Sequence, residues 1–189
     1  MTPQERIDNY NRELSFPNSL FVAGNGELVG MWRMGNDYRV KSEYYGGYPA
    51  GYLKRIRALF PDKTNVLHLF SGKVDLSIIP GDTVDLSEEL EPTYLDDAQT
   101  LGGVPLRNYD LILADPPYSV EDADHYQKAM VKRNLVMRSL GRVRPGTHVC
   151  WLDQVLPMYR KDMWKLYGSI GMVRSTNHRF RIVTIFESL

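Results

Sequence analysis

Asp115-Pro116-Pro117-Tyr118 is the stretch of this chain whose residue types are best suited to chemistry. It follows the apolar run of residues 109–114, which predicts a buried strand. A carboxylate accepts hydrogen bonds, and a proline carbonyl is an acceptor on a stiff backbone that has no N–H. The tetrapeptide therefore favours a site that holds a planar amino group while its nitrogen attacks a methyl donor.

The same residues indicate how such a reaction would work. An aromatic exocyclic amine is a poor nucleophile because its lone pair is delocalised into the ring. The Asp115 carboxylate and the Pro116 carbonyl would accept its two N–H bonds and favour a pyramidal nitrogen, while Pro117 stiffens the loop further. Tyr118 would stack on the aromatic ring that carries the amine. The alternative is a proline-rich surface loop.

Five short apolar segments in the middle of the chain predict the strands that position this stretch: residues 66–70, 83–86, 93–95, 111–114 and 147–152. Crossovers between such strands indicate an α/β domain with a mainly parallel sheet. In open sheets of this kind the ligand lies beyond the carboxyl ends of the strands. Polar residues or glycine stand at several of these ends: Ser71-Gly72, Asp85, Asp97-Ala98 and Asp115.

The rest of the chain divides into an N-terminal extension, residues 1–43, and the main domain, residues 44–189. In the extension we expect irregular structure to residue 18 and then a small hairpin of residues 20–22 and 28–32. In the main domain we expect helices and a final antiparallel hairpin around residues 175–177. The helices are expected at residues 50–60, 126–140 and 155–166, and the hairpin strands at residues 169–174 and 179–187.

Composition sets broad limits on the class of protein. The chain has 189 residues, 43% of them hydrophobic, and 23 basic residues balance 23 acidic ones. This balance does not favour strong nonspecific DNA binding, and each basic cluster, including Arg174, Arg179 and Arg181, reads as solvated surface charge. The four histidines lack metal-ligand spacing, and the single cysteine, Cys150, is expected to be structural. With no signal peptide and no run able to cross a bilayer, we expect a cytoplasmic protein without membrane partners.

The strand ends taken together resemble a known family. Leu69-Phe70-Ser71-Gly72, Asp85, Asp97-Ala98 and Asp115-Pro116-Pro117-Tyr118 occur in the order seen in S-adenosylmethionine-dependent amino-methyltransferases of nucleic acids. The chain is most similar to the DNA adenine-N6 branch, which includes compact phage and prophage members, and the resemblance covers roughly residues 44–187. It implies a Rossmann-like class I methyltransferase sheet, S-adenosyl-L-methionine as cofactor, and DNA in preference to RNA as partner.

The resemblance also implies roles for individual residues. Phe70, Ser71 and Gly72 would line the methionine end of the cofactor, and Asp85 would accept hydrogen bonds from the ribose hydroxyls. Asp97 would take the adenine amino group. Each aspartate has an alternative role, because Asp85 and Asp97 are also suited to cap a turn.

Three further residues follow from the same resemblance. Ala98 would pack beside the adenine ring of the cofactor. Tyr48 and Pro49 belong to an aromatic, glycine-rich loop, residues 45–49, at the place where some family members have another cofactor-binding segment.

The sequence departs from the family in two places. Residues 73–82 are too few, and contain Pro80-Gly81, for the full helix that normally separates the first two strands. The amino-acid end of the cofactor must therefore be covered differently, for instance by residues 45–49, or else be bound weakly. No stretch is long enough for a separate target-recognition domain. Sequence specificity is then either minimal or supplied by the N-terminal segment, the final hairpin, a second subunit of a homodimer or a partner protein.

The tetrapeptide leaves several substrates open. It or close variants also serve cytosine N4 in DNA, guanine N2 in ribosomal RNA and glutamine amides in protein, which are all planar nitrogens. A different class is a non-catalytic module that keeps the fold and binds cofactor or nucleic acid. The missing helix after Gly72 favours that class, and the intact Asp115 and Tyr118 oppose it.

Overall fold

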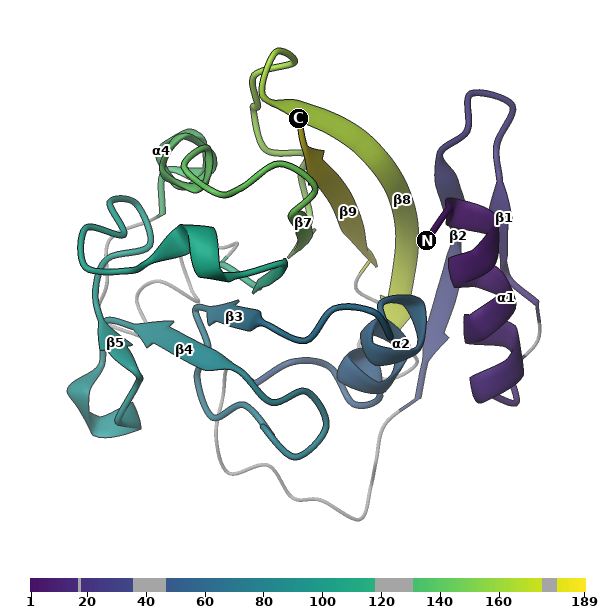
Figure 1. Cartoon of the computed structure of the whole chain (residues 1–189). Helices are drawn as coiled ribbons and strands as arrows, with labels where there is room; N and C mark the ends of the chain where they lie inside the picture. Colours follow the sequence, from purple (N-terminus) through teal and green to yellow (C-terminus); the bar gives the residue numbers. More distant parts are fainter. Residues whose placement is uncertain (17, 36–46, 118–130, 175–179) are drawn as a thin grey trace.

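The computed structural model describes residues 1–16, 18–35, 47–117, 131–174 and 180–189. These residues form a nine-stranded sheet in the order β1-β2-β8-β9-β7-β6-β3-β4-β5 (Figure 1). The strands are β1 (Leu20–Val22), β2 (Leu28–Met34), β3 (Val66–Leu69), β4 (Asp82–Asp85), β5 (Tyr94–Leu95), β6 (Leu111–Ala114), β7 (His148–Asp153), β8 (Trp164–Arg174) and β9 (Phe180–Ser188). All nine lie where apolar segments predict strands, although β8 begins earlier than expected.

The sheet is mixed and mainly parallel, as expected. Five of its eight neighbouring strand pairs are parallel, including the continuous set β5-β4-β3-β6-β7. Strand β9 runs antiparallel to both β7 and β8, which confirms the predicted C-terminal hairpin. The chain order reverses between β3 and β6, because β3 pairs with β4 on one side and with β6 on the other. A parallel sheet carries its ligand-binding crevice at such a reversal.

Both faces of the central strands are buried, and alternate residues enter two separate cores. Leu111 and Leu113 of β6 pack in a first core beneath α1 (Pro3–Glu13) and α2 (Tyr52–Leu59). Ile112 and Ala114 pack in a second core with α4 (Arg133–Leu140). Successive side chains of a strand point to opposite faces, so a central strand with helices on both sides is apolar throughout.

The first residues of the chain are helical, and the expectation of irregular structure there is wrong. Helix α1 starts with a capping box in which the Thr2 hydroxyl accepts from the Glu5 N–H and the Glu5 carboxylate accepts from the Thr2 N–H. Pro3 occupies the first helical position, where its missing N–H costs nothing. Ile7 and Tyr10 bury one side of the helix in the first core.

The predicted helix of residues 155–166 is also wrong. The chain makes an irregular connection and a turn there, and β8 begins at Trp164. Val155, Leu156 and Met158 are exposed, so these apolar side chains do not form a core-facing helical stripe. Pairing of Trp164 with Ser188 and packing of its ring on Phe186 (centroids 6.3 Å apart) favour the strand instead.

Two other helix predictions are confirmed where the structure describes them. The helix expected over residues 50–60 is α2, and the later part of the one expected over residues 126–140 is α4; residues 126–130 lie outside the described residues. Between β3 and β4 the chain forms turns without a helix, as the short spacing predicts. Two short 3-10 helices, η1 (Glu88–Leu90) and η2 (Leu106–Asn108), lie in the following connections.

The N-terminal hairpin of β1 and β2 continues the sheet. The two strands are antiparallel, and β2 pairs in parallel with β8 from Leu28 to Met34. Figure 1 shows this hairpin, with α1 beside it, at the opposite end of the sheet from β4 and β5.

Candidate functional site

The turn after β3 has an unusual backbone. Phe70 has a φ of 57° and Gly72 a φ of 52°, both in the left-handed region, and Ser71 between them is buried. A residue with a side chain adopts this conformation at a cost of about 1–3 kcal/mol and only where its surroundings enforce it. Such strain is commonest at ligand-binding sites, so the turn is a candidate for close contact with a bound molecule.

Asp85, at the end of β4, holds this turn in place. Its Oδ2 accepts the Gly72 N–H at 3.2 Å, and its Oδ1 accepts the Ser87 N–H at 3.0 Å. The predicted neighbours Phe70, Ser71, Gly72 and Asp85 are therefore brought together. The alternative prediction, that Asp85 organises a turn, is confirmed by these two hydrogen bonds. A carboxylate has about four acceptor positions, so these two bonds do not by themselves prevent a further bond from a diol.

Asp97 follows β5 and organises the next strand end. Its Oδ1 accepts the Gln99 N–H at 2.9 Å, and the Gln99 side-chain amide donates to Oδ1 at 3.3 Å and to Oδ2 at 3.1 Å. Ala98 is buried in the second core, against which Phe70 packs. Asp97 therefore stands at the expected edge, and its carboxylate is engaged locally.

Gln99 is a residue of this site that the sequence reasoning missed. Besides bonding Asp97, its Oε1 accepts the Lys132 N–H at 3.0 Å, and Lys132 is the residue that precedes α4. The sequence feature that predicts this role is that Gln99 stands two residues after Asp97, so its side-chain amide can reach the Asp97 carboxylate. Gln99 joins the end of β5 to the beginning of α4.

Asp115, Pro116 and Pro117 follow β6 directly, as predicted, and Tyr118 lies outside the described residues. Asp115 is largely buried and forms an ion pair with Arg181 of β9. Both side chains belong to the first-core face. Leu111, Leu113 and Asp115 alternate along one strand, while Arg181, Val183 and Ile185 alternate along the other.

Tyr48 lies against the carboxyl end of β6. Its hydroxyl donates to the Leu113 carbonyl at 3.4 Å, and its ring stacks on Tyr52 with centroids 5.3 Å apart. Burial raises the pKa of Tyr48 well above its ordinary value, and the nearby Asp115 charge adds to the shift. Pro49 accepts the Tyr52 N–H at 2.9 Å and so begins α2. The preceding loop residues Tyr45 and Gly46 lie outside the described residues.

The sequence pattern indicates that Arg181 is one charge of a solvated cluster, and the structure corrects this because its side chain is 4% exposed. The sequence feature that predicts its burial is the two-residue spacing from Val183 and Ile185, which places Arg181 on the buried face of the predicted strand. Its partner stands 66 residues earlier in the chain, and that pairing has no local signature.

A second buried Arg–Asp pair lies at the same edge. Asp153, the last residue of β7, accepts from Arg133 Nε at 2.6 Å and Nη2 at 3.1 Å, from Trp151 Nε1 at 3.1 Å and from the Gln154 N–H at 2.7 Å. Because Arg133 starts α4, the pair attaches that helix to the sheet. Asp153 shares its face with Val149 and Trp151, so this pair lies on the second-core side.

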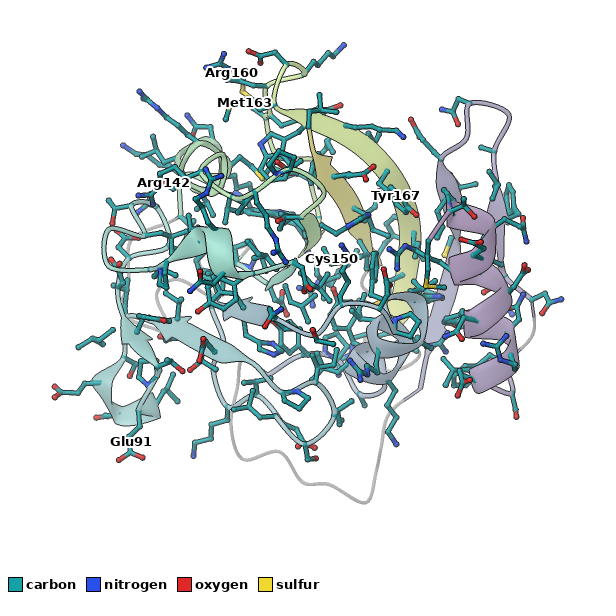
Figure 2. The ribbon with its side chains drawn as sticks, viewed as in Figure 1. Glu91, Arg142, Cys150, Arg160, Met163 and Tyr167 are labelled. Atoms are coloured by element: carbon teal, nitrogen blue, oxygen red, sulfur yellow. The ribbon has the colours of Figure 1, made fainter. Side chains whose placement is uncertain are left out.

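Cys150 is a core residue. It is fully buried in β7, and burial raises the pKa of its thiol. Figure 2 shows it in the interior of the molecule. Within the described residues no group of three or more histidine, cysteine, aspartate or glutamate side chains is placed to hold a metal ion. In that same part of the chain no helix has the length and apolar character needed to span a bilayer.

Comparison with known proteins adds no relative. No family model matches the chain, and no curated protein is significantly similar to it.

Proposed function

We propose that this protein is an S-adenosyl-L-methionine-dependent methyltransferase that acts on the N6 amino group of adenine in DNA. The observation that carries the proposal is the reversal of strand order between β3 and β6. Counted from β3, the order β5-β4-β3-β6-β7 is 3-2-1-4-5, the order found in Rossmann-like nucleotide-binding sheets. The turn Phe70-Ser71-Gly72 and the stretch Asp115-Pro116-Pro117 follow the two strands that meet at this reversal.

The described residues fit the proposed cofactor. A backbone turn with two left-handed residues allows close approach of a ligand at Gly72. The carboxylates of Asp85 and Asp97 stand at successive strand ends, and acceptor-only groups suit the ribose diol and the adenine amino group. Ala98 follows Asp97 directly, and its small side chain is buried in the second core. The Gln99 amide on Asp97 would have to share that carboxylate with the adenine.

The tetrapeptide supplies the proposed catalytic groups. Asp115 and the Pro116 carbonyl accept the two N–H bonds of the target amine and localise its lone pair. The localised lone pair would then be directed toward the methyl donor. Bound S-adenosyl-L-methionine supplies the methyl group, already activated as a sulfonium. Tyr118 stacks on the base, Pro117 stiffens the loop, and alignment by this rigid segment contributes to the rate.

A non-catalytic module that binds cofactor or nucleic acid is the second candidate. It is favoured by the turns between β3 and β4, where a full helix would cover the cofactor. That connection is held by Asp75, whose carboxylate accepts the Ser77 N–H at 3.0 Å, and by the buried Ile79. This candidate predicts binding without turnover.

One experiment separates these functions and the substrates left open. The protein is incubated with methyl-labelled S-adenosyl-L-methionine and separate pools of DNA, RNA and protein, and the modified products are identified by mass spectrometry. We expect N6-methyladenine in DNA. Label at cytosine N4, guanine N2 or glutamine would redirect the substrate assignment, and label in no pool would favour the non-catalytic module.

The Asp115→Ala variant tests the mechanism. We expect it to lose methyl transfer while it still binds S-adenosyl-L-methionine in calorimetry. Because the change removes the partner of a buried arginine, folding must be checked by circular dichroism and thermal unfolding. Equal activity of a folded Asp115→Ala protein would exclude the proposed role of the carboxylate.

A further inference from the structure

Arg181 and Asp115 form a buried ion pair at the centre of the candidate site. A guanidinium nitrogen of Arg181, Nη2, donates to Asp115 Oδ1, and the two side chains are 4% and 12% exposed. A charged hydrogen bond in such surroundings is strong, and removing one member leaves a buried charge without compensation. The pair is therefore costly to break and constrains the Asp115 carboxylate.

The fold delivers Arg181 to this place across an intervening strand. Strand β7 lies between β6 and β9, and neighbouring strands stand about 4.8 Å apart, so the two backbones are roughly 10 Å apart. Both side chains project on the first-core face, and arginine is long enough to cover most of that separation. The antiparallel hairpin of β8 and β9 thus contributes a side chain to the end of β6.

Three titratable groups near Asp115 in the described residues are neutral. They are Tyr48 before α2, Tyr52 in α2 and Cys150 in β7; Tyr48 and Tyr52 interact electrostatically with Asp115 and with Cys150. Burial raises the pKa of each, so none carries charge at physiological pH. The Arg181 guanidinium is always protonated, so it supplies a permanent positive charge on this face.

We propose that Arg181 is a positioning residue of the reaction, which holds the Asp115 carboxylate ionised and in one orientation toward the target amine. This inference rests on the proposed function. Asp115 then serves as a hydrogen-bond acceptor, and the proton lost from the methylated nitrogen passes to water. A carboxylate has about four acceptor positions, so the bond from Arg181 does not by itself prevent Asp115 from accepting an N–H of the substrate.

The pH dependence of methyl transfer in Arg181→Met and Arg181→Lys tests the proposal. Without the guanidinium, buried Asp115 takes up a proton more readily, so activity of Arg181→Met should rise steeply with pH. Its loss relative to wild type should grow roughly tenfold for each pH unit below the new titration point. The loss should appear in kcat, and Arg181→Lys should restore the wild-type profile because it returns the positive charge.

Two matched variants control for nonspecific effects. Arg6→Met removes a buried arginine that pairs with Asp62 and also bonds the Leu59 carbonyl and the Tyr167 hydroxyl, and Arg160→Met removes an arginine from an exposed pair. Figure 2 shows Arg160 at the margin of the molecule. Both should keep the wild-type pH profile. The same profile for folded Arg181→Met would overturn the inference.

A second readout does not depend on activity. The carbon-13 signal of the Asp115 carboxyl, assigned with Asp115→Asn, is followed through a pH titration in wild type and in the Arg181 variants. In wild type it should stay in the ionised position between about pH 5 and pH 9. A protonated wild-type carboxyl in that range would overturn the inference even if Arg181→Met fails to fold. An ionised carboxyl in a protein that transfers no methyl group would leave the effect of Arg181 on the Asp115 charge intact and reject the proposed function.

Discussion

The Asp85 carboxylate accepts the backbone N–H of Gly72 at 3.2 Å and so joins the end of β4 to the strained turn after β3. Its other oxygen accepts the Ser87 N–H at 3.0 Å. The residue assigned to the cofactor ribose is therefore also the residue that shapes the neighbouring turn. Substitutions at Asp85 should affect the binding contact and the backbone at once, and variants that separate these effects are informative.

Asp85→Ala should weaken S-adenosyl-L-methionine binding by about tenfold to a hundredfold, since hydrogen bonds to a charged group contribute about 1.5–3 kcal/mol. Asp85→Asn keeps one acceptor oxygen and should lose less affinity. Isothermal calorimetry measures both, with Glu89→Ala as the control because Glu89 is an exposed carboxylate in the adjacent 3-10 helix. Unchanged affinity of Asp85→Ala would remove the ribose assignment.

The Arg133–Asp153 pair should stabilise the attachment of α4 to the sheet. Asp153 is fully buried and accepts four hydrogen bonds, so Asp153→Ala should lower the free energy of unfolding by about 3–5 kcal/mol. Urea denaturation gives this value. In a double-mutant cycle, Arg133→Met should cost far less in the Asp153→Ala background than in wild type. Additive losses would show that the two residues act independently.

Arg6 should anchor the N-terminal helix to the domain. It donates to Asp62 at 2.6 and 3.1 Å, to the Leu59 carbonyl at 3.0 Å and to the Tyr167 hydroxyl at 3.1 Å. Arg6→Met should therefore destabilise the protein by about 3–5 kcal/mol, because the buried Leu59 carbonyl and Tyr167 hydroxyl lose their donor and the partly exposed Asp62 loses its ion pair. Arg12→Met, in an exposed pair, should change stability by less than about 1 kcal/mol. Equal thermal unfolding of the two variants would contradict the anchoring role.

Stability should depend on pH through two buried histidines. Burial lowers the pKa of His68 to about 4 and of His148 to about 3, from the ordinary value of 6.5. Below pH 6.5 the unfolded chain therefore binds protons that the folded protein does not, and the free energy of unfolding falls as pH decreases. Each histidine contributes a slope of roughly 1.4 kcal/mol per pH unit at most.

His148→Phe should reduce this slope. The His148 ring packs between Phe60 and Tyr167, with centroids 5.2 and 4.7 Å away, so a phenyl ring suits the site. The variant also loses the hydrogen bond between His148 Nδ1 and the Gly146 carbonyl oxygen. This loss lowers the free energy of unfolding by the same amount at every pH where the ring is neutral, so it does not change the slope. Urea denaturation at several pH values between 6.5 and about 4 measures the difference. Parallel curves for variant and wild type would show that His148 is not neutral in the fold.

Local pattern was sufficient for much of the fold. Strands such as Leu111–Ala114 are short apolar runs bounded by polar residues and turns, and both faces of the central sheet are buried, so hydrophobic content alone marks them. The two helix errors have different causes. Helix α1 starts with a capping box, Thr2 to Glu5, which is a local sequence signal, and Arg6 then docks the helix on the domain. The apolar residues around Leu156 face solvent because Trp164 pairs in β8, so there a tertiary contact overrides the apolar pattern.

The sequence by itself determined which side chains stand at the carboxyl ends of the strands, including Asp85, Asp97 and Asp115, because strand ends are local features. Only the tertiary structure decided how these side chains are engaged. Asp85 holds the Gly72 turn, Asp97 bonds Gln99, and Asp115 pairs with Arg181 from a hairpin 66 residues later. The bond of Asp97 to Gln99 is local, whereas the Gly72 and Arg181 partners depend on strand order and on the face that each strand buries, which are properties of the assembled sheet.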